Sequence, residues 1–194
     1  MCDLVHGNKK FMQSHKYESQ REKVLNKQDP CVVVICCSDS RVPPEVIFQA
    51  LDLGQLFVIR VAGPALSQCD IDSVRYAVEN LNPYSIIVLG HQNCGAITAC
   101  WEEIYHVCAC TEDECQNPEL TSALYPCLFK YIEPSCVKMP NKTQDENIQK
   151  SMKINVYRTS QLLIDVLNVD AKMVRNAYYN MKTGKVRFFD YQGD

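Results

Sequence analysis

Two short apolar runs, each followed by a polar segment, constrain the fold of this chain more than any other feature. Residues 32–35 are Val-Val-Val-Ile, and residues 86–89 are Ile-Ile-Val-Leu. Runs this short, apolar and β-branched are typical of strands buried on both faces of a parallel sheet. In such sheets, ligand-binding residues gather just beyond the carboxyl ends of the strands. We therefore predict that the two polar segments meet in space despite their separation in sequence.

The polar segments contain the donor groups of a zinc site that keeps one position open for chemistry. They are Cys-Ser-Asp-Ser-Arg at 37–41 and His-Gln-Asn-Cys at 91–94. A His and a Cys three residues apart arise by chance in a chain with 12 cysteines, and the plain alternative is a helix start with one core cysteine. Because both segments stand at matching strand ends, we predict Cys37, His91 and Cys94 as the ligands of a catalytic metal.

Asp39 and Arg41 lie two residues apart in the first segment. A carboxylate and a guanidinium this close usually pair, which keeps the carboxylate ionised and fixes its orientation. The alternative is a simple salt bridge within a loop. Since a predicted metal ligand stands beside the pair, we predict Asp39 and Arg41 as catalytic residues.

Taken together, these segments resemble those of a β-class carbonic anhydrase. The resemblance covers residues 28–190, is strong over the first half and is loose between 104 and 150. It rests on Cys-Ser-Asp-Ser-Arg-Val-Pro-Pro-Glu at 37–45, Gly-Gln-Leu-Phe-Val-Ile-Arg-Val-Ala-Gly at 54–63, Arg-Tyr-Ala-Val-Glu at 75–79, Gly-His-Gln-Asn-Cys-Gly-Ala at 90–96, Ala-Tyr-Tyr at 177–179 and Thr-Gly-Lys-Val-Arg-Phe-Phe at 183–189.

The resemblance implies an α/β fold in which a mostly parallel central sheet is flanked by helices, with an N-terminal helical arm and a C-terminal hairpin-like extension. The length agrees with one domain over residues 1–194. Residues 1–28 are expected to form the arm, which packs on a partner subunit. Since the family is built on dimers with active-site clefts at the subunit interface, we expect a homodimer or a dimer of dimers.

The implied activity is the zinc-dependent, reversible hydration of carbon dioxide to bicarbonate and a proton, with one Zn²⁺ per chain and attack by a zinc-bound hydroxide. Asp39 held by Arg41 would orient the zinc-bound water. Released from Arg41, Asp39 would become the fourth zinc ligand in a closed, inactive state. Two alternatives stay open: a carbonyl sulfide or carbon disulfide hydrolase on the same scaffold, and a non-catalytic zinc or redox protein.

Gln28 and Gly95 are the predicted substrate-binding residues. Gln28 precedes Cys37 by nine residues, as does the glutamine that hydrogen-bonds substrate in plant-type relatives. Val34 replaces the Trp of regulated bacterial relatives, so the chain resembles the constitutively open type. The alternatives are a solvated residue at a helix end for Gln28 and helix–sheet packing for Gly95. Pro64 replaces the Asn of many relatives.

Composition argues against several other kinds of protein. A net charge of −3 with scattered Lys and Arg argues against nucleic acid as a partner. The first residues lack the apolar stretch of a signal peptide, and no apolar run approaches the ~20 residues of a membrane span. We therefore expect a cytoplasmic protein that binds neither nucleic acid nor membrane.

The remaining cysteines call for different explanations. We predict that Cys31, Cys36 and Cys100 are small core hydrophobes. A second group lies in an acidic stretch, and its spacing matches no standard zinc finger, so we favour an oxidation-prone loop over a second metal site. This group consists of His106, Cys108, Cys110 and Cys115.

The remaining pattern gives a coarse order of elements. The polar residues 9–28 are helix-prone. Residues 70–73 offer N-cap candidates for a separate helix that ends near residue 81. A Lys-Thr-Gly turn at 182–184 predicts a hairpin. The predicted strands are 31–36, 56–61, 85–90, 171–180 and 185–190, and the predicted helices end near 81, 105, 132 and 168.

Overall fold

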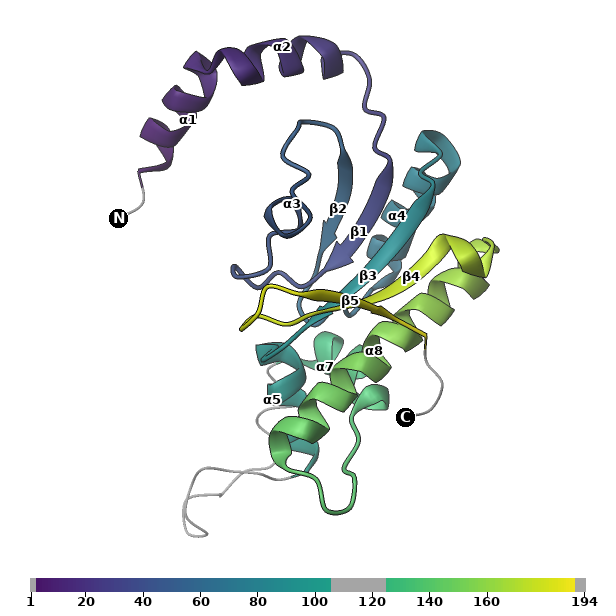
Figure 1. Ribbon diagram of the computed structural model, residues 1–194. Coiled ribbons are helices and arrows are strands. Elements are labelled where there is room, and N and C mark those ends of the chain that lie inside the picture. Colours follow the sequence, from purple (N-terminus) through teal and green to yellow (C-terminus); the bar gives the residue numbers. More distant parts are fainter. Residues whose placement is uncertain (1–2, 106–124, 191–194) are drawn as a thin grey trace.

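A mostly parallel five-stranded sheet forms the centre of the protein (Figure 1). The computed structural model describes residues 3–105 and 125–190. The strand order is β2-β1-β3-β4-β5, in which only β5 runs antiparallel to its neighbour. The predicted α/β class is therefore confirmed. The strands are β1 (Val32–Cys36), β2 (Leu56–Arg60), β3 (Ser85–His91), β4 (Val174–Tyr179) and β5 (Val186–Phe189).

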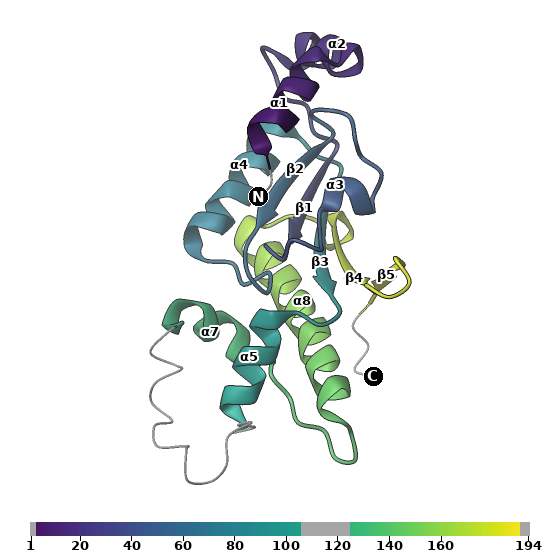
Figure 2. The same cartoon turned by 90° about the vertical axis from the view of Figure 1, so that its left-hand side faces the viewer.

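Helices pack on both faces of the sheet, and most of them lie on one face. The side chains of Val33 and Ile35 on β1 join the core formed with these helices, whereas Val32 and Val34 point to the opposite face. This alternation explains why every residue of β1 is buried. The helices of the larger core are α4 (Gln68–Leu81), α5 (Gly95–Ile104), α7 (Pro126–Ile132) and α8 (Gln144–Leu167), and the short α3 (Pro44–Ile47) contributes to the other face (Figure 2).

Helix α8 approaches the sheet closely at Gly90 of β3. A Cβ atom built on Gly90 would lie 2.6 Å from Cγ2 of Val156 and 2.8 Å from Sδ of Met152. Only glycine allows this approach, because real Cβ contacts do not become so short. Since Gly90 directly precedes His91, the packing of α8 fixes the end of the strand that carries a predicted metal ligand.

Two local predictions about the elements are wrong. The cap of α4 is Ser67, and Asp70 stands three residues later as the acidic partner of a capping box, with Ser67 N donating to its Oδ2 at 2.8 Å. The predicted strand 171–180 begins with a 3₁₀ turn, η2 (Ala171–Met173), because Asp170 caps that turn by accepting a hydrogen bond from Lys172 N.

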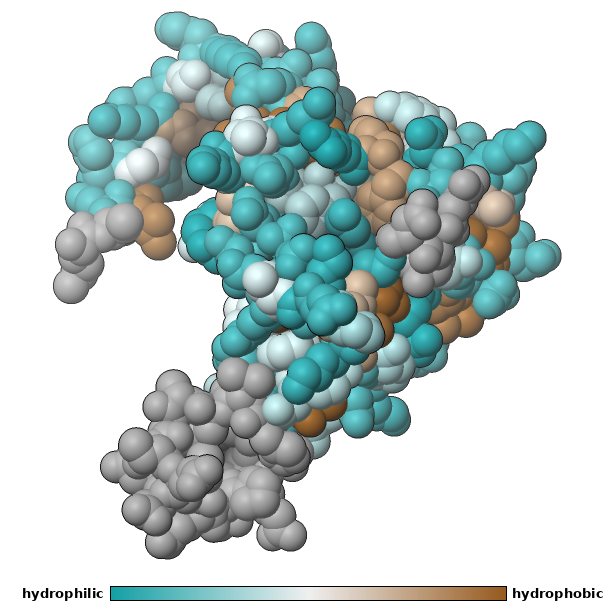
Figure 3. Space-filling view, turned by 60° about the horizontal axis from the view of Figure 1, so that its bottom comes forward, coloured by the Kyte–Doolittle hydropathy of each residue, from teal (hydrophilic) through white to brown (hydrophobic). Residues whose placement is uncertain are grey.

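The N-terminal arm consists of α1 (Leu4–Gln13) and α2 (His15–Val24), which stand away from the sheet at the end opposite to α5 (Figure 1). Neither helix buries a residue. Gln20 attaches α2 to the body, since its Nε2 donates to Asp52 Oδ1 at 2.5 Å and its Oε1 accepts from Leu53 N at 3.0 Å. The space-filling view shows apolar side chains on the projecting arm (Figure 3). They include Leu4, Val5 and Met12, with exposed fractions of 80, 67 and 62 %.

The cysteines divide into several environments. Cys36 and Cys100 are fully buried, as predicted. Cys31 is exposed, so its predicted core role is wrong: it precedes β1, and its thiol donates to the Gln55 carbonyl at 3.2 Å. The group of His106, Cys108, Cys110 and Cys115 lies outside the described residues. No helix in the described ranges is long and apolar enough to cross a membrane.

Candidate metal centre

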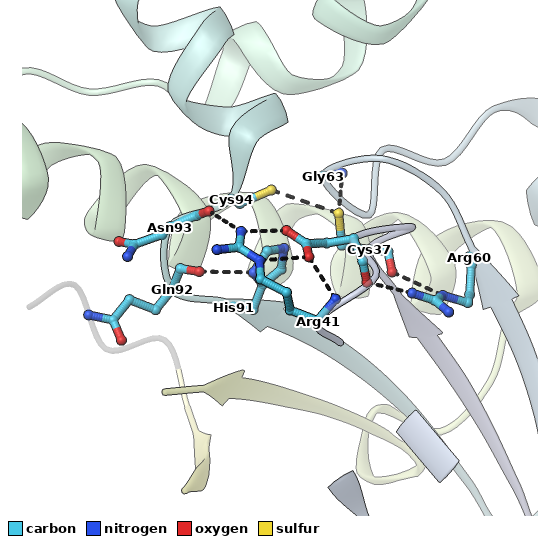
Figure 4. Close-up of polar contacts among 9 residues, drawn as sticks. Cys37, Arg41, Arg60, Gly63, His91, Gln92, Asn93 and Cys94 are labelled. Carbon is cyan, nitrogen blue, oxygen red and sulfur yellow. Dashed lines mark hydrogen bonds and ion pairs between the residues drawn. The ribbon is translucent and has the colours of Figure 1, made fainter. Parts of the chain in front are cut away.

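The carboxyl ends of β1 and β3 bring the two predicted polar segments together (Figure 4). Cys37 directly follows β1, and His91 is the last residue of β3. Cys94 caps the start of α5. Since β1 and β3 are parallel neighbours, their ends lie side by side, which is the arrangement that the sequence predicts.

The three predicted ligands form a compact, buried cluster. One donor atom from each of Cys37, His91 and Cys94 lies within 4.8 Å of the others. The two sulfur atoms are 3.9 Å apart. The exposed fractions of the three residues are 5, 1 and 1 % in that order. Two sulfurs and one imidazole nitrogen at this spacing match the donor set of a zinc site with an open fourth position.

His91 presents one ring nitrogen to the cluster without a hydrogen-bond partner. Its Nδ1 lies 2.9 Å from the Gln92 carbonyl, so Nδ1 carries the proton and donates to that oxygen. The other nitrogen, Nε2, is buried and has no partner among the described residues. A buried acceptor left unpaired is costly, and a bound metal ion satisfies it. The residues present therefore fit a metal ion.

The two thiols differ strongly in acidity because they lie against each other. The hydrogen bond from the Cys94 thiol lowers the pKa of Cys37 well below its usual range, with a smaller contribution from the backbone N–H of Gly63 and against the opposing effect of burial. The hydrogen bond to Cys37 and burial raise the pKa of Cys94. The cluster thus accepts one negative charge readily and resists a second. A divalent cation removes that resistance, since it stabilises both thiolates at once.

Asp39 and Arg41 form the predicted pair, and the pair also joins the two polar segments. Arg41 donates through Nε to Asp39 Oδ1 at 3.0 Å and through Nη2 to Oδ2 at 2.7 Å. Its backbone N–H also donates to Oδ1 at 2.9 Å. The side-chain hydrogen bond from Arg41 is the main reason why the pKa of Asp39 falls to about 2. Arg41 Nη2 additionally donates to the Asn93 carbonyl at 3.1 Å.

Arg60 is a residue of the site that the sequence reasoning missed. It ends β2, and its guanidinium donates to the carbonyl of Cys37 at 3.2 Å and to that of Asp39 at 2.6 Å (Figure 4). These two bonds fix the backbone of the loop that carries the first ligand and the carboxylate. The sequence did offer a signal for this residue: an arginine ends an apolar strand inside a segment that already resembles the family.

The loop after Arg60 supports the Cys37 sulfur from the other side. Gly63 N donates to Cys37 Sγ at 3.4 Å. Helix α8 holds this loop in turn, because Asn155 Nδ2 donates to the Gly63 carbonyl at 2.6 Å and Thr159 Oγ1 to that of Pro64 at 3.2 Å. Pro64 has φ 24°, far from the value near −65° that its ring prefers, so these bonds hold a strained turn.

The two predicted substrate-binding residues lie in different places. Gly95 begins α5 directly after Cys94, is exposed, and a Cβ built on it meets no heavy atom of the described residues within 4 Å. Its backbone therefore borders open space beside the cluster, and helix–sheet packing does not explain this glycine. Gln28 is exposed and precedes β1, at the end of that strand opposite to Cys37. A single chain does not bring Gln28 to the cluster.

Comparison with known proteins agrees with this geometry. The family model described as carbonic anhydrase matches residues 32–186, which include every residue of the cluster. The chain belongs to the β-carbonic anhydrase family. Carbonic anhydrase 2 of Mycobacterium tuberculosis is 40 % identical over 101 residues, which cover 50 % of this chain and 48 % of that protein. The Synechocystis carbonic anhydrase is 39 % identical over 106 residues, covering 50 % and 38 %. The chain thus matches less than half the length of these curated relatives.

Solved structures show that the fold extends over almost the whole chain. The β-carbonic anhydrase CcaA has a TM-score of 0.74 and 23 % identity, with 96 % of this chain and 93 % of that chain covered. The Coccomyxa β-carbonic anhydrase, solved with acetazolamide, has a TM-score of 0.72 and 23 % identity, covering 96 % and 84 %. β-Carbonic anhydrases are zinc enzymes, and Cys37, His91 and Cys94 form a cluster that can bind a metal.

Proposed function

We propose that this protein catalyses the reversible hydration of carbon dioxide to bicarbonate and a proton, using one Zn²⁺ per chain held by Cys37, His91 and Cys94. The observation that carries the proposal is the unpartnered Nε2 of His91 beside two thiols, at the same strand ends as a carboxylate fixed by an arginine. Membership of the family supports the same reaction. When bound, zinc supplies Lewis acidity that lowers the pKa of water and makes a nucleophile available near neutral pH.

The role that we propose for Asp39 is to orient the attacking water. With both carboxylate oxygens engaged by Arg41 and a pKa of about 2, Asp39 stays ionised and acts as a hydrogen-bond acceptor at neutral pH. Arg41 holds this carboxylate in one orientation, and Arg60 holds the backbone beneath it. Gly95 leaves room beside the cluster, so we propose that its backbone N–H borders the carbon dioxide site.

Asp39 also has a second proposed state. In the structure, the donor atoms that lie within 4.8 Å of one another belong to Cys37, His91 and Cys94, and the carboxylate of Asp39 is paired with Arg41 instead. Without that pair, the carboxylate would be free to serve as a further ligand of a bound metal in place of water. We propose that the Asp39–Arg41 pair keeps the site open.

We propose that the protein acts as a homodimer or a dimer of dimers. The projecting arm carries exposed apolar side chains that a second copy would cover. A structural relative from Sordaria macrospora, with a TM-score of 0.66 and 18 % identity, is tetrameric. A second copy would also give Gln28 a route to a metal centre, since it lies far from the centre of its own chain.

Stopped-flow measurement of carbon dioxide hydration by the zinc-loaded protein, between about pH 6.5 and 9, tests the proposal. We expect activity that rises with pH. The matched control is Cys94→Ser, which loses both zinc and activity. An inactive protein that nevertheless binds one zinc per chain would overturn the proposal, and faster turnover of carbonyl sulfide or carbon disulfide would redirect it to the hydrolase reaction.

A further inference from the structure

A hollow lined by cations lies between α8 and the hairpin that β4 and β5 form. Helix α8 packs against β4, and the hairpin lies beside the helix in both ribbon views (Figure 1, Figure 2). The hollow has a volume of about 810 Å³. Sites for small molecules have volumes of about 300–1,000 Å³, so the hollow is large enough to hold one. None of the residues predicted for the metal centre or for substrate binding lines it.

The cations of the hollow come from two elements that face each other. The pairing of β4 with β5 places Arg187 directly opposite Tyr178, whose side chain joins the core under the helices. Because side chains alternate along a strand, Lys185 shares this face with Arg187. Helix α8 contributes Lys150 and Lys153, which are three residues apart and therefore lie on one side of the helix.

The hollow concentrates positive charge in a chain whose net charge is −3. Four of the eleven residues that line it are Lys or Arg, against 20 of 194 in the whole chain. Asp190 is the one carboxylate among these eleven. Lys153, Lys185 and Arg187 form no ion pair with any residue of the described ranges. An anion in the hollow would therefore neutralise charges that the described part of the chain leaves uncompensated.

Tyr178 adds an aromatic ring and an unused polar group to the wall. Lys153 Nζ lies 5.6 Å from the centre of the Tyr178 ring. Tyr178 is 8 % exposed, and its hydroxyl has no hydrogen-bond partner among the described residues. Burial raises the pKa of this hydroxyl to about 12, so it keeps its proton at neutral pH. A ligand oxygen that reaches the hydroxyl would satisfy this donor.

We propose that the hollow binds a small anion that carries a chain of two or more phosphate groups. The guanidinium of Arg187 offers paired N–H donors that match phosphate oxygens, and the lysines supply further positive charge. Cations on two facing walls suit a ligand with several negative charges, whereas bicarbonate has only one. This site is distinct from Cys37, His91 and Cys94, and the proposal does not depend on the hydration reaction.

Isothermal titration calorimetry of the full-length, zinc-loaded protein tests the proposal. The probes are ATP, sodium tripolyphosphate and sodium orthophosphate, at one pH and one ionic strength. We expect ATP and tripolyphosphate to bind at one per chain, and orthophosphate to bind at least about tenfold more weakly because it has fewer charged oxygens. The affinity should fall as salt is added, since salt screens exposed charges.

The two phosphate-chain probes distinguish the sources of this chemistry. Equal affinity for ATP and tripolyphosphate would identify the phosphate chain as the group that is recognised. Tighter binding of ATP would show that the hollow also contacts the nucleoside. Zinc analysis before and after each titration determines whether the probes remove the metal ion, since phosphate chains chelate divalent cations.

Single charge-removing variants locate the site. Lys153→Gln alters the helix wall and Arg187→Gln the hairpin wall, and each should weaken tripolyphosphate binding about fivefold. Lys182→Gln is the matched control, because it removes the same charge from the exposed turn of the hairpin, outside the hollow. Its affinity should equal that of the wild type. All three side chains are exposed, and circular dichroism verifies that each variant is folded.

Several results would overturn the inference. One is the lack of saturable binding with both ATP and tripolyphosphate. Another is an equal loss of affinity in Lys182→Gln and Arg187→Gln, because binding would then follow the overall charge of the surface. A third is orthophosphate that binds as tightly as tripolyphosphate, which would exclude a phosphate chain as the ligand. Heat that accompanies loss of zinc and is unchanged in Lys153→Gln and Arg187→Gln would assign the signal to chelation instead.

Discussion

At the scale of single residues, the Asp39–Arg41 pair decides which state the metal centre adopts. We expect Arg41→Ala to lower the rate of carbon dioxide hydration about 100-fold, because a carboxylate no longer held in place loses its orientation and is free to bind the metal. Stopped-flow kinetics and zinc analysis on the same sample measure both effects. The zinc content should stay at one per chain. Arg41→Lys keeps the charge but loses the two-point contact, so its hydration rate should lie between that of the wild type and that of Arg41→Ala. A wild-type rate in Arg41→Ala contradicts this role.

The same pair makes a pH-dependent contribution to stability. The folded-state pKa of Asp39 is about 2, below the ordinary value of 3.8, so the ionised carboxylate stabilises the fold. This contribution is complete above about pH 4 and is lost as the pH falls to about 2. Because Arg41 is 56 % exposed, solvent screening limits it to about 1 kcal/mol. Urea unfolding of the metal-free protein should show Asp39→Asn less stable by that amount at pH 6 and equally stable at pH 2; a constant difference would refute the assignment.

Replacing Gly95 distinguishes whether this residue serves substrate binding or folding. A methyl group there meets no described atom, so Gly95→Ala should fold with unchanged or slightly higher stability, by less than about 1 kcal/mol. The methyl would occupy the open space beside Cys94, and we expect kcat/KM for carbon dioxide to fall about tenfold with normal zinc content. Thermal unfolding and stopped-flow kinetics are the two measurements. Full activity in Gly95→Ala would show that substrate does not approach this residue.

The site residues differ in how far the sequence could reveal them. Cys37, His91 and Cys94 were predictable because each comes just after a recognisable apolar run, and parallel strands bring their carboxyl ends together. The hydrogen bond that fixes the His91 ring goes to the backbone carbonyl of Gln92, and a backbone contact cannot be recognised from residue types. Arg60 was not predicted because it contacts two backbone carbonyl groups in the loop after β1, and any residue offers a carbonyl.

At the scale of elements, the strands were easier to predict than the ends of the helices. The runs before Cys37 and His91 mark β1 and β3 because a strand covered on both faces favours apolar residues at successive positions, and β1 is buried at every one. Helix ends depend on single hydrogen bonds. Ser67 and Asp70 are both good caps, and only the fold decides that Ser67 is the cap and Asp70 its partner.

The packing of α8 on β3 supports the metal centre, because it holds the end of the strand that carries His91. We expect Gly90→Ala to destabilise the protein by about 1–3 kcal/mol, because the new Cβ would overlap Val156 and Met152. Urea unfolding of the zinc-free protein measures this loss. Val156→Ala in the Gly90→Ala background removes the closest atom and should recover part of the stability, so the two substitutions should be non-additive. Strictly additive losses would show that α8 does not press on β3 at this point.

At the scale of the whole molecule, the separation between the arm and the metal centre gives a direct test of the proposed dimer. Gln28 leads out of the arm at the amino end of β1, and the metal centre lies at the carboxyl end. If Gln28 binds substrate, a second copy has to bring it to the site. We therefore expect Gln28→Ala to reduce activity without loss of zinc, and the wild-type protein to sediment as a dimer or a larger assembly.

A mixed dimer distinguishes action across the interface from action within one chain. One chain carries Gln28→Ala with an intact metal centre, and the other carries Cys37→Ser with an intact Gln28. Each parent protein should have little activity. Across the interface, the Gln28 of the second chain serves the metal centre of the first, so a purified mixed dimer should recover about half of the wild-type activity. If Gln28 instead acts on the metal centre of its own chain, neither site in the mixed dimer is complete, and the mixed dimer should be as inactive as its parents. Recovery of activity would establish the site as one that two copies build together.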